Sequence, residues 1–94
     1  MRVIRKYTLT MEREQDMELP ARAHILKVGE QNGKPVMWAL VDHSAPAVRG
    51  IVRIFETGEE FQEFSKEHQD GFKGDYLGSF TLSDGREFHV VRAA

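Results

Sequence analysis

The dipeptide Asn32-Gly33 lies between two runs of apolar residues, and it constrains the fold of this chain more than any other feature. Asparagine and glycine best tolerate the positive φ that both central residues of a type I′ turn require, so a β-hairpin with a two-residue turn is predicted. The turn then sets the cross-strand pairs: Gln31 with Lys34, Glu30 with Pro35, Gly29 with Val36, Val28 with Met37, Lys27 with Trp38 and Leu26 with Ala39.

The second strand of this hairpin is apolar from residue 36 to residue 41, which is typical of a strand covered on both faces. Alternation assigns one face to His24, Leu26, Val28, Met37, Ala39 and Val41, and the other to Ile25, Lys27, Gly29, Val36, Trp38 and Leu40. Trp38 then lies over a lysine stem and beside a glycine, so we expect a helix, a second chain or a ligand to cover its ring. Because Pro35 lacks an N–H, a strand on the far side is expected to start beyond it.

The rest of the chain predicts further short strands. They are expected at residues 3–9, 16–20 and 51–56, with a loop over 42–50 and a second hairpin over 76–92. Asp84-Gly85 is predicted as the two-residue turn of that hairpin, which places Phe80 opposite His89 and Gly78 opposite Val91.

One short helix is predicted at about residues 58–68. Thr57 and Glu60 have the spacing of a capping box, and Phe61 and Phe64 share one helix face. The predicted fold class is mainly β (α+β): a small antiparallel sheet or half-open barrel of about seven short strands with this helix.

Length and charge limit the classes of function. Ninety-four residues correspond to a single domain over 1–94, whose thin core self-association would help to cover. The 13 Lys and Arg against 15 Asp and Glu give a net charge of −2, which argues against binding to duplex nucleic acid.

The chain has no cysteine, which excludes disulfides, thiolate zinc sites and a cysteine nucleophile. It also lacks a signal-peptide core and an apolar run long enough to span a membrane, so a cytoplasmic protein without membrane contact is expected. Common catalytic and phosphate-binding motifs are missing, and the four histidines fall in different predicted elements. No catalytic residue, metal or cofactor is therefore predicted.

Three stretches nevertheless supply candidate ligand contacts. Asp42-His43 follows the apolar strand, where a scaffold can present an acid and a base, although an aspartate there can equally cap its own turn. Lys73 lies between two glycines near Tyr76, where backbone N–H groups, a cation and an aromatic ring could hold a nucleotide; a flexible connector is the alternative. His89 is interpreted as a strand residue packed beside its cross-strand neighbour, and it is kept as a candidate contact.

Several segments resemble a family of small proteins encoded by bacteriophages and prophages. The shared patterns are a Lys-Tyr-x-Leu start in residues 2–9 and Val-Gly-x-Gln-Asn-Gly followed by Trp-Ala-Leu-Val-Asp in residues 18–42. Tyr-Leu-Gly-x-Phe in residues 76–80 and Phe-His-Val in residues 88–90 complete them. The chain departs from the pattern between residues 55 and 74, so the predicted helix is expected to be peculiar to this member. The resemblance brings no activity with it and assigns no catalytic residue.

The resemblance implies an accessory protein that acts by binding. We expect a non-enzymatic homo-oligomer that counteracts host antiviral defence by capturing a nucleotide-derived signal or a host protein in the host cytoplasm. The expected contact residues are Trp38, Lys27, Asp42, His43, Lys73, Tyr76 and His89. Two alternatives stay open: a small hydrolase that acts on a nucleotide-like ligand through Asp42, His43 and Lys73, and a virion or assembly component.

Overall fold

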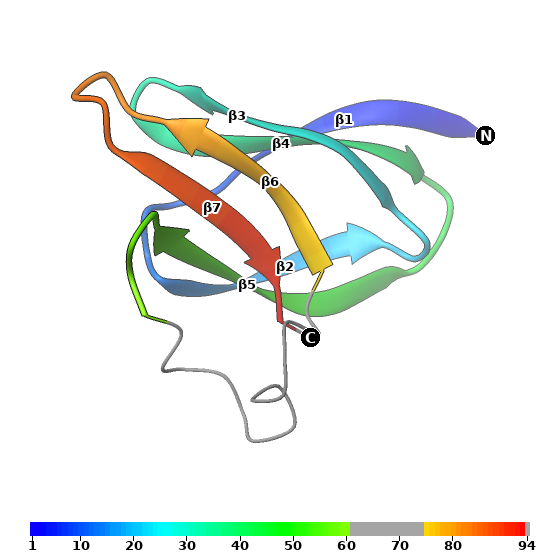
Figure 1. The fold of residues 1–94 in the computed structure, drawn as a ribbon. Helices are drawn as coiled ribbons and strands as arrows, with labels where there is room; N and C mark the ends of the chain where they lie inside the picture. The colour runs from blue at the N-terminus through cyan, green and yellow to red at the C-terminus, as the bar shows by residue number, and fades with distance from the viewer. Residues whose placement is uncertain (61–74, 94) are drawn as a thin grey trace.

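The computed structural model describes residues 1–60 and 75–93, and these residues form an all-β fold of two antiparallel sheets (Figure 1). Sheet A has the strand order β1-β4-β3, and sheet B has the order β2-β5-β7-β6. The strands are β1 Arg2–Thr8, β2 Glu14–Pro20, β3 His24–Gln31, β4 Lys34–Asp42, β5 Ala47–Glu56, β6 Asp75–Thr81 and β7 Glu87–Arg92. The prediction of a small antiparallel β fold is confirmed.

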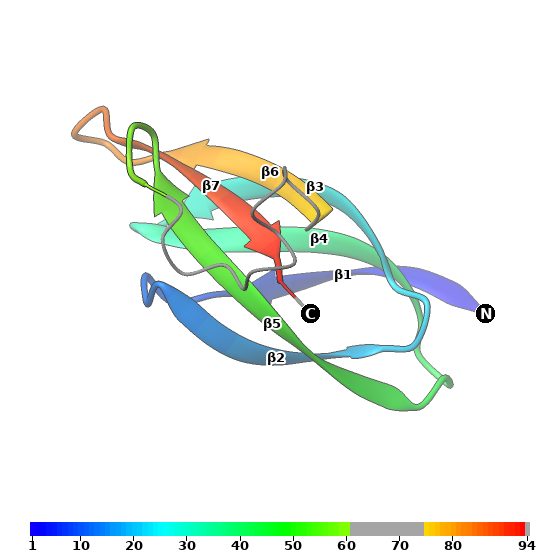
Figure 2. The ribbon, with the colours of Figure 1, turned by 60° about the horizontal axis from the view of Figure 1, so that its bottom comes forward.

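The two sheets face each other, and β6 of sheet B runs alongside β3 of sheet A (Figures 1 and 2). The approach is close because Gly78 on β6 has no side chain: a Cβ there would lie 2.8 Å from the Cβ and Cγ2 atoms of Val28 on β3. In the part of the chain that is described, no ladder of hydrogen bonds joins these two strands. The fold is therefore an open sandwich and not a closed barrel.

The first hairpin has the predicted turn. Asn32 and Gly33 have φ values of 55° and 79°, as a type I′ turn requires, and the register from Gln31–Lys34 to Lys27–Trp38 is as predicted. β1 pairs with β4 on the side away from β3, and the last pair of this ladder is Thr8 with Val36. The pairing therefore stops before it reaches Pro35, as predicted.

The predicted register is wrong beyond Lys27, because β3 contains a bulge between Ile25 and Lys27. Ile25 takes the place opposite Ala39 that the prediction gave to Leu26, and Leu26 is left 48% exposed. A bulge adds one residue to one strand, so every residue before it moves to the other face.

The second hairpin is also one residue out of the predicted register. Ser79 and not Phe80 lies opposite His89, and Gly78 lies opposite Val90. The loop has three residues between Leu82 and Arg86, and Gly85 alone adopts the positive φ, at 92°. This is the turn-plus-bulge hairpin that three-residue loops favour.

The predicted short helix is not borne out. Residues 58–60, where it was expected to begin, form a turn and an irregular segment, and its remaining residues up to 68 lie outside the described residues. The capping box is wrong as well, because the Thr57 hydroxyl donates to Glu87 at 2.8 Å. The loop predicted over 42–50 ends early, since β5 already pairs with β2 from Ala47.

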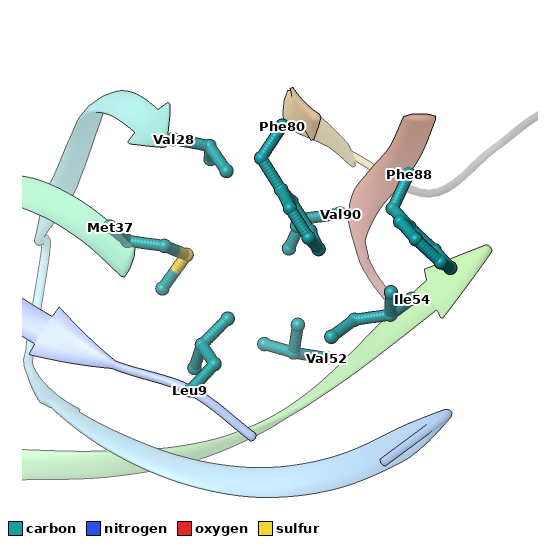
Figure 3. Close-up of a cluster of buried hydrophobic side chains, with 8 residues drawn as sticks. All are labelled: Leu9, Val28, Met37, Val52, Ile54, Phe80, Phe88 and Val90. Atoms are coloured by element: carbon teal, nitrogen blue, oxygen red, sulfur yellow. The ribbon is translucent and has the colours of Figure 1, made fainter. Parts of the chain in front are cut away.

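The core lies between the sheets and receives side chains from both (Figure 3). Phe80 and Phe88 are directly opposite each other on β6 and β7, and their rings stack with centroids 5.4 Å apart. Such pairs add about 0.5–1.5 kcal/mol to the stability given by their buried area. The cluster comprises Leu9, Val28, Met37, Val52, Ile54, Phe80, Phe88 and Val90.

Candidate functional site

The predicted contact residues fall in separate parts of the fold. Trp38 and Lys27 lie together on sheet A, and Tyr76 and His89 lie together on sheet B. Asp42 and His43 are at the end of β4. Lys73 lies outside the described residues.

Trp38 lies on the face of sheet A that is turned away from the core. Its neighbours Met37 and Ala39 are both 0% exposed, so alternation along β4 places the Trp38 side chain on the opposite face. Lys6 on β1 and Lys27 on β3 are its cross-strand neighbours. The sole tryptophan is therefore flanked by a cation on each side, and it remains partly exposed.

The indole ring contacts both Lys27 and Gly29. The Lys27 ammonium lies 5.3 Å from the ring centroid, within the range of a cation–π interaction. A Cβ at Gly29 would lie 3.1 Å from Cζ3 of the indole, so the glycine lets the ring lie close to the sheet.

Lys6 reaches across the central strand of sheet A. Its ammonium donates to Oε1 of Gln31 at 3.0 Å, and these residues belong to the two strands that flank β4. The Lys6 stem must therefore cross β4, which accounts for the 1% exposure of Val36 on this outward face. We call Lys6, Lys27, Gly29, Val36 and Trp38 the Trp38 face.

The Trp38 face combines an aromatic ring with uncompensated positive charge. Neither lysine forms an ion pair with a carboxylate within residues 1–60 and 75–93. Flat aromatic ligands stack on indole rings, and ammonium groups attract phosphates. The sequence indicated Trp38 and Lys27 as contacts but not Lys6, whose position depends on the pairing of β1 with β4.

Asp42 closes its own loop. Its Oδ1 atom accepts hydrogen bonds from the Ser44 hydroxyl at 2.7 Å and from the Ser44 N–H at 3.0 Å. These bonds stabilise the charged carboxylate and hold the pKa of Asp42 below its usual range. The geometry agrees with the alternative in which Asp42 caps a turn; His43 is exposed beside it.

Tyr76 and His89 belong to a chain of hydrogen bonds on the outer face of sheet B. The Tyr76 hydroxyl lies 2.7 Å from Nδ1 of His89, and Nε2 of His89 lies 2.6 Å from the Thr57 hydroxyl. Thr57 donates onward to Glu87 at 2.8 Å. With Nε2 protonated, a neutral imidazole accepts from Tyr76 and donates to Thr57, so every bond in the chain is satisfied.

Sequence reasoning missed Thr57 and Glu87 as members of this chain. Glu87 and His89 are two residues apart on β7, so strand alternation alone places them on one face. Thr57 was assigned to a helix cap instead, and only the pairing of β5 with β7 brings it to His89.

The described part of the chain shows neither a metal-binding cluster nor a membrane-spanning helix. No group of three or more histidine, aspartate or glutamate side chains there could hold a metal ion. No helix there is long and apolar enough to cross a membrane.

Comparison with known proteins gives a family but no activity. Neither a curated protein nor a solved structure is similar to the chain. One family model, described as a domain of unknown function (DUF7352), matches residues 1–94. The match spans the whole sequence, and the chain therefore belongs to the DUF7352 family.

Proposed function

We propose that this protein is a non-enzymatic binding protein that captures a nucleotide-derived ligand on the Trp38 face. One observation carries the proposal: a partly exposed tryptophan has a lysine on each neighbouring strand. The indole supplies a stacking surface for a base, and the two ammonium groups supply charge for a phosphate.

The expected contact energies total about 3–5 kcal/mol, which corresponds to a Kd of about 0.2–6 mM for one chain. Stacking of a base on an aromatic side chain contributes about 1–3 kcal/mol. Each ammonium placed near a phosphate on a partly exposed surface adds about 1 kcal/mol more, and this part weakens as salt rises. Lys27 already lies against the ring, so a ligand would have to share or displace its cation–π contact.

The biological role that we propose is removal of a signal. A protein that sequesters a nucleotide messenger would counteract an antiviral defence that the messenger activates. The resemblance of residues 18–42 to phage-encoded proteins supports this context. Capture of a host protein by the same face is the alternative partner.

Tryptophan fluorescence tests the proposal, because Trp38 is the only tryptophan in the chain. Titration with cyclic mononucleotides and cyclic dinucleotides should change its emission saturably for at least one compound. Lys27→Gln should weaken that binding about fivefold, the equivalent of about 1 kcal/mol. Arg5→Gln is the matched control, because Arg5 lies on β1 opposite Ala39, on the other face from Lys6. Equal losses in both variants would show a non-specific effect of charge.

We also propose that the protein self-associates. Ile4 is 62% exposed on β1, which is an edge strand of sheet A, and an apolar side chain there is suited to contact a second copy. Native mass spectrometry should give a mass that is a multiple of the 10.8 kDa of one chain. Ile4→Lys should lower the number of chains in the assembly. A monomer at micromolar concentration would reject self-association and leave ligand capture untouched.

The hydrogen-bonded chain at His89 favours a second candidate function, hydrolysis of a nucleotide-like ligand. An imidazole held between Tyr76 and Thr57 could accept or release a proton at the Tyr76 oxygen, which is the arrangement that acid–base chemistry needs. Incubation with the same nucleotide panel distinguishes the two candidates. Capture returns each compound intact, whereas hydrolysis consumes one of them and stops in His89→Ala.

A further inference from the structure

A small cavity lies between the two sheets, away from the Trp38 face. Its volume is about 120 Å³. Its apolar lining comes from β2, β3, β4, β5 and β6: Met17, Leu19, Ile25, Met37, Val52 and Leu77.

The cavity lies between the fully buried part of the core and the solvent. Met37 and Val52 are buried, whereas Met17, Ile25 and Leu77 pack against the same cluster and stay partly exposed. Apolar side chains that point between two sheets and are not fully covered leave room for an apolar ligand.

Three arginines also line this cavity. Arg49 is paired with Asp16 at 2.6 Å. Arg22 and Arg92 have neither an ion pair nor a side-chain hydrogen bond with any side chain of residues 1–60 and 76–93. Two guanidinium groups beside an apolar cavity favour a ligand with an anionic end.

The backbone at Arg22 strengthens this interpretation. Arg22 has a φ of 65°, a left-handed conformation that glycine adopts at lower cost than any other residue. Hydrogen bonds from Ala23 N to Pro20 O at 3.2 Å and from Ala21 N to Pro46 O at 2.8 Å hold the turn in place. The position thus accepts backbone strain and carries a cation where glycine would be favoured.

We propose that this cavity, together with the arginines at its rim, binds a small organic acid; we call this site the arginine-rimmed cleft. The apolar body of the acid lies in the cavity, and the carboxylate of the acid lies between Arg22 and Arg92. A cavity of about 150 Å³ can hold one benzene ring, so the body should be a single ring or a short branched chain. A nucleotide is too large for this volume. The cleft is therefore a second site, independent of nucleotide capture on the outer face of sheet A.

Titration with benzoate tests the proposal on the full chain. Methyl NMR signals of Met17, Ile25 and Leu77 should shift saturably, and the Trp38 indole signal should not. Benzyl alcohol has the same ring without the charge and should bind about tenfold more weakly. If no methyl signal shifts saturably, or if both compounds bind equally well, the proposal is wrong.

Two variants separate binding from folding. Arg22→Gly and Arg92→Gln should each weaken benzoate binding about fivefold, while Arg22→Gly should unfold at the same or a higher denaturant concentration because it relieves the positive φ. Arg86→Gln, directly before β7 and at the other end of that strand from Arg92, is the control and should bind as the original chain does. Unchanged benzoate affinity in both cleft variants would overturn the assignment of Arg22 and Arg92.

Discussion

Gly78 is a residue at which the two sheets come close together. Its φ is 154°, and a Cβ there would lie 2.8 Å from two side-chain atoms of Val28. Gly78→Ala should therefore destabilise the fold by about 1–3 kcal/mol, the usual range for overpacking. Urea unfolding measures the change, with the exposed neighbour Ser79→Ala as a control near zero. An unchanged midpoint for Gly78→Ala would mean that β3 and β6 are not in close contact.

Asp42 gives a pH-dependent prediction at the same scale. Hydrogen bonds from Ser44 lower the pKa of Asp42 in the folded protein, so their contribution to stability is present above the usual carboxyl range, near pH 4. That contribution is lost as the pH falls through the lowered pKa.

Ser44→Ala should raise the pKa of Asp42 and leave that of Asp84 low, because Arg86 and not Ser44 stabilises the Asp84 carboxylate. Carboxyl NMR signals followed against pH measure both groups in one experiment. The stability difference between Ser44→Ala and the original chain should shrink below about pH 4. A pKa of Asp42 that does not move would contradict the role given to Ser44.

At the level of strands, the features that could be predicted from the sequence are those set by residues close together in the chain. Asn32-Gly33 determines the turn by its backbone preferences, and with it the register as far as Lys27. The bulge at Leu26 carries no local signature, since no glycine lies between Ile25 and Lys27. It is detectable only after β3 has paired with β4 and packed against β6.

The second hairpin and the candidate site show the same limit. Asp84-Gly85 is compatible with loops of two or three residues, and the side chain of Asp84 selects the longer loop by accepting the Arg86 N–H at 3.0 Å. Trp38 with Lys27 could be predicted because both belong to one hairpin. The contact of Thr57 with His89 could not, since it joins residues 32 positions apart.

The bulge gives a prediction for β3. Leu26→Ser should change the free energy of unfolding by no more than about 0.5 kcal/mol, because Leu26 is 48% exposed. Ile25→Ser should cost about 1–3 kcal/mol, because Ile25 packs against the core cluster. Denaturant unfolding of the two variants provides the comparison. The register without a bulge predicts the reverse order.

In the whole molecule, the open sandwich exposes chemically different surfaces. The outer face of sheet A carries Trp38 between two lysines, the outer face of sheet B carries the hydrogen-bonded chain at His89, and the space between the sheets opens at Arg22. Because these surfaces are separate, a ligand for one need not perturb the others. Binding can therefore be assigned to a surface by the residues that respond.

Amide and indole NMR spectra of the full chain, recorded during titration with the nucleotide panel, test the central claim most directly. Capture on the Trp38 face predicts saturable shifts of the Trp38 indole N–H and of the Lys6 and Lys27 amides, with the signals of Tyr76 and His89 unchanged. Nucleotide binding with shifts confined to Tyr76 and His89 would contradict the account. So would a Trp38 signal that no member of the panel moves at millimolar concentration.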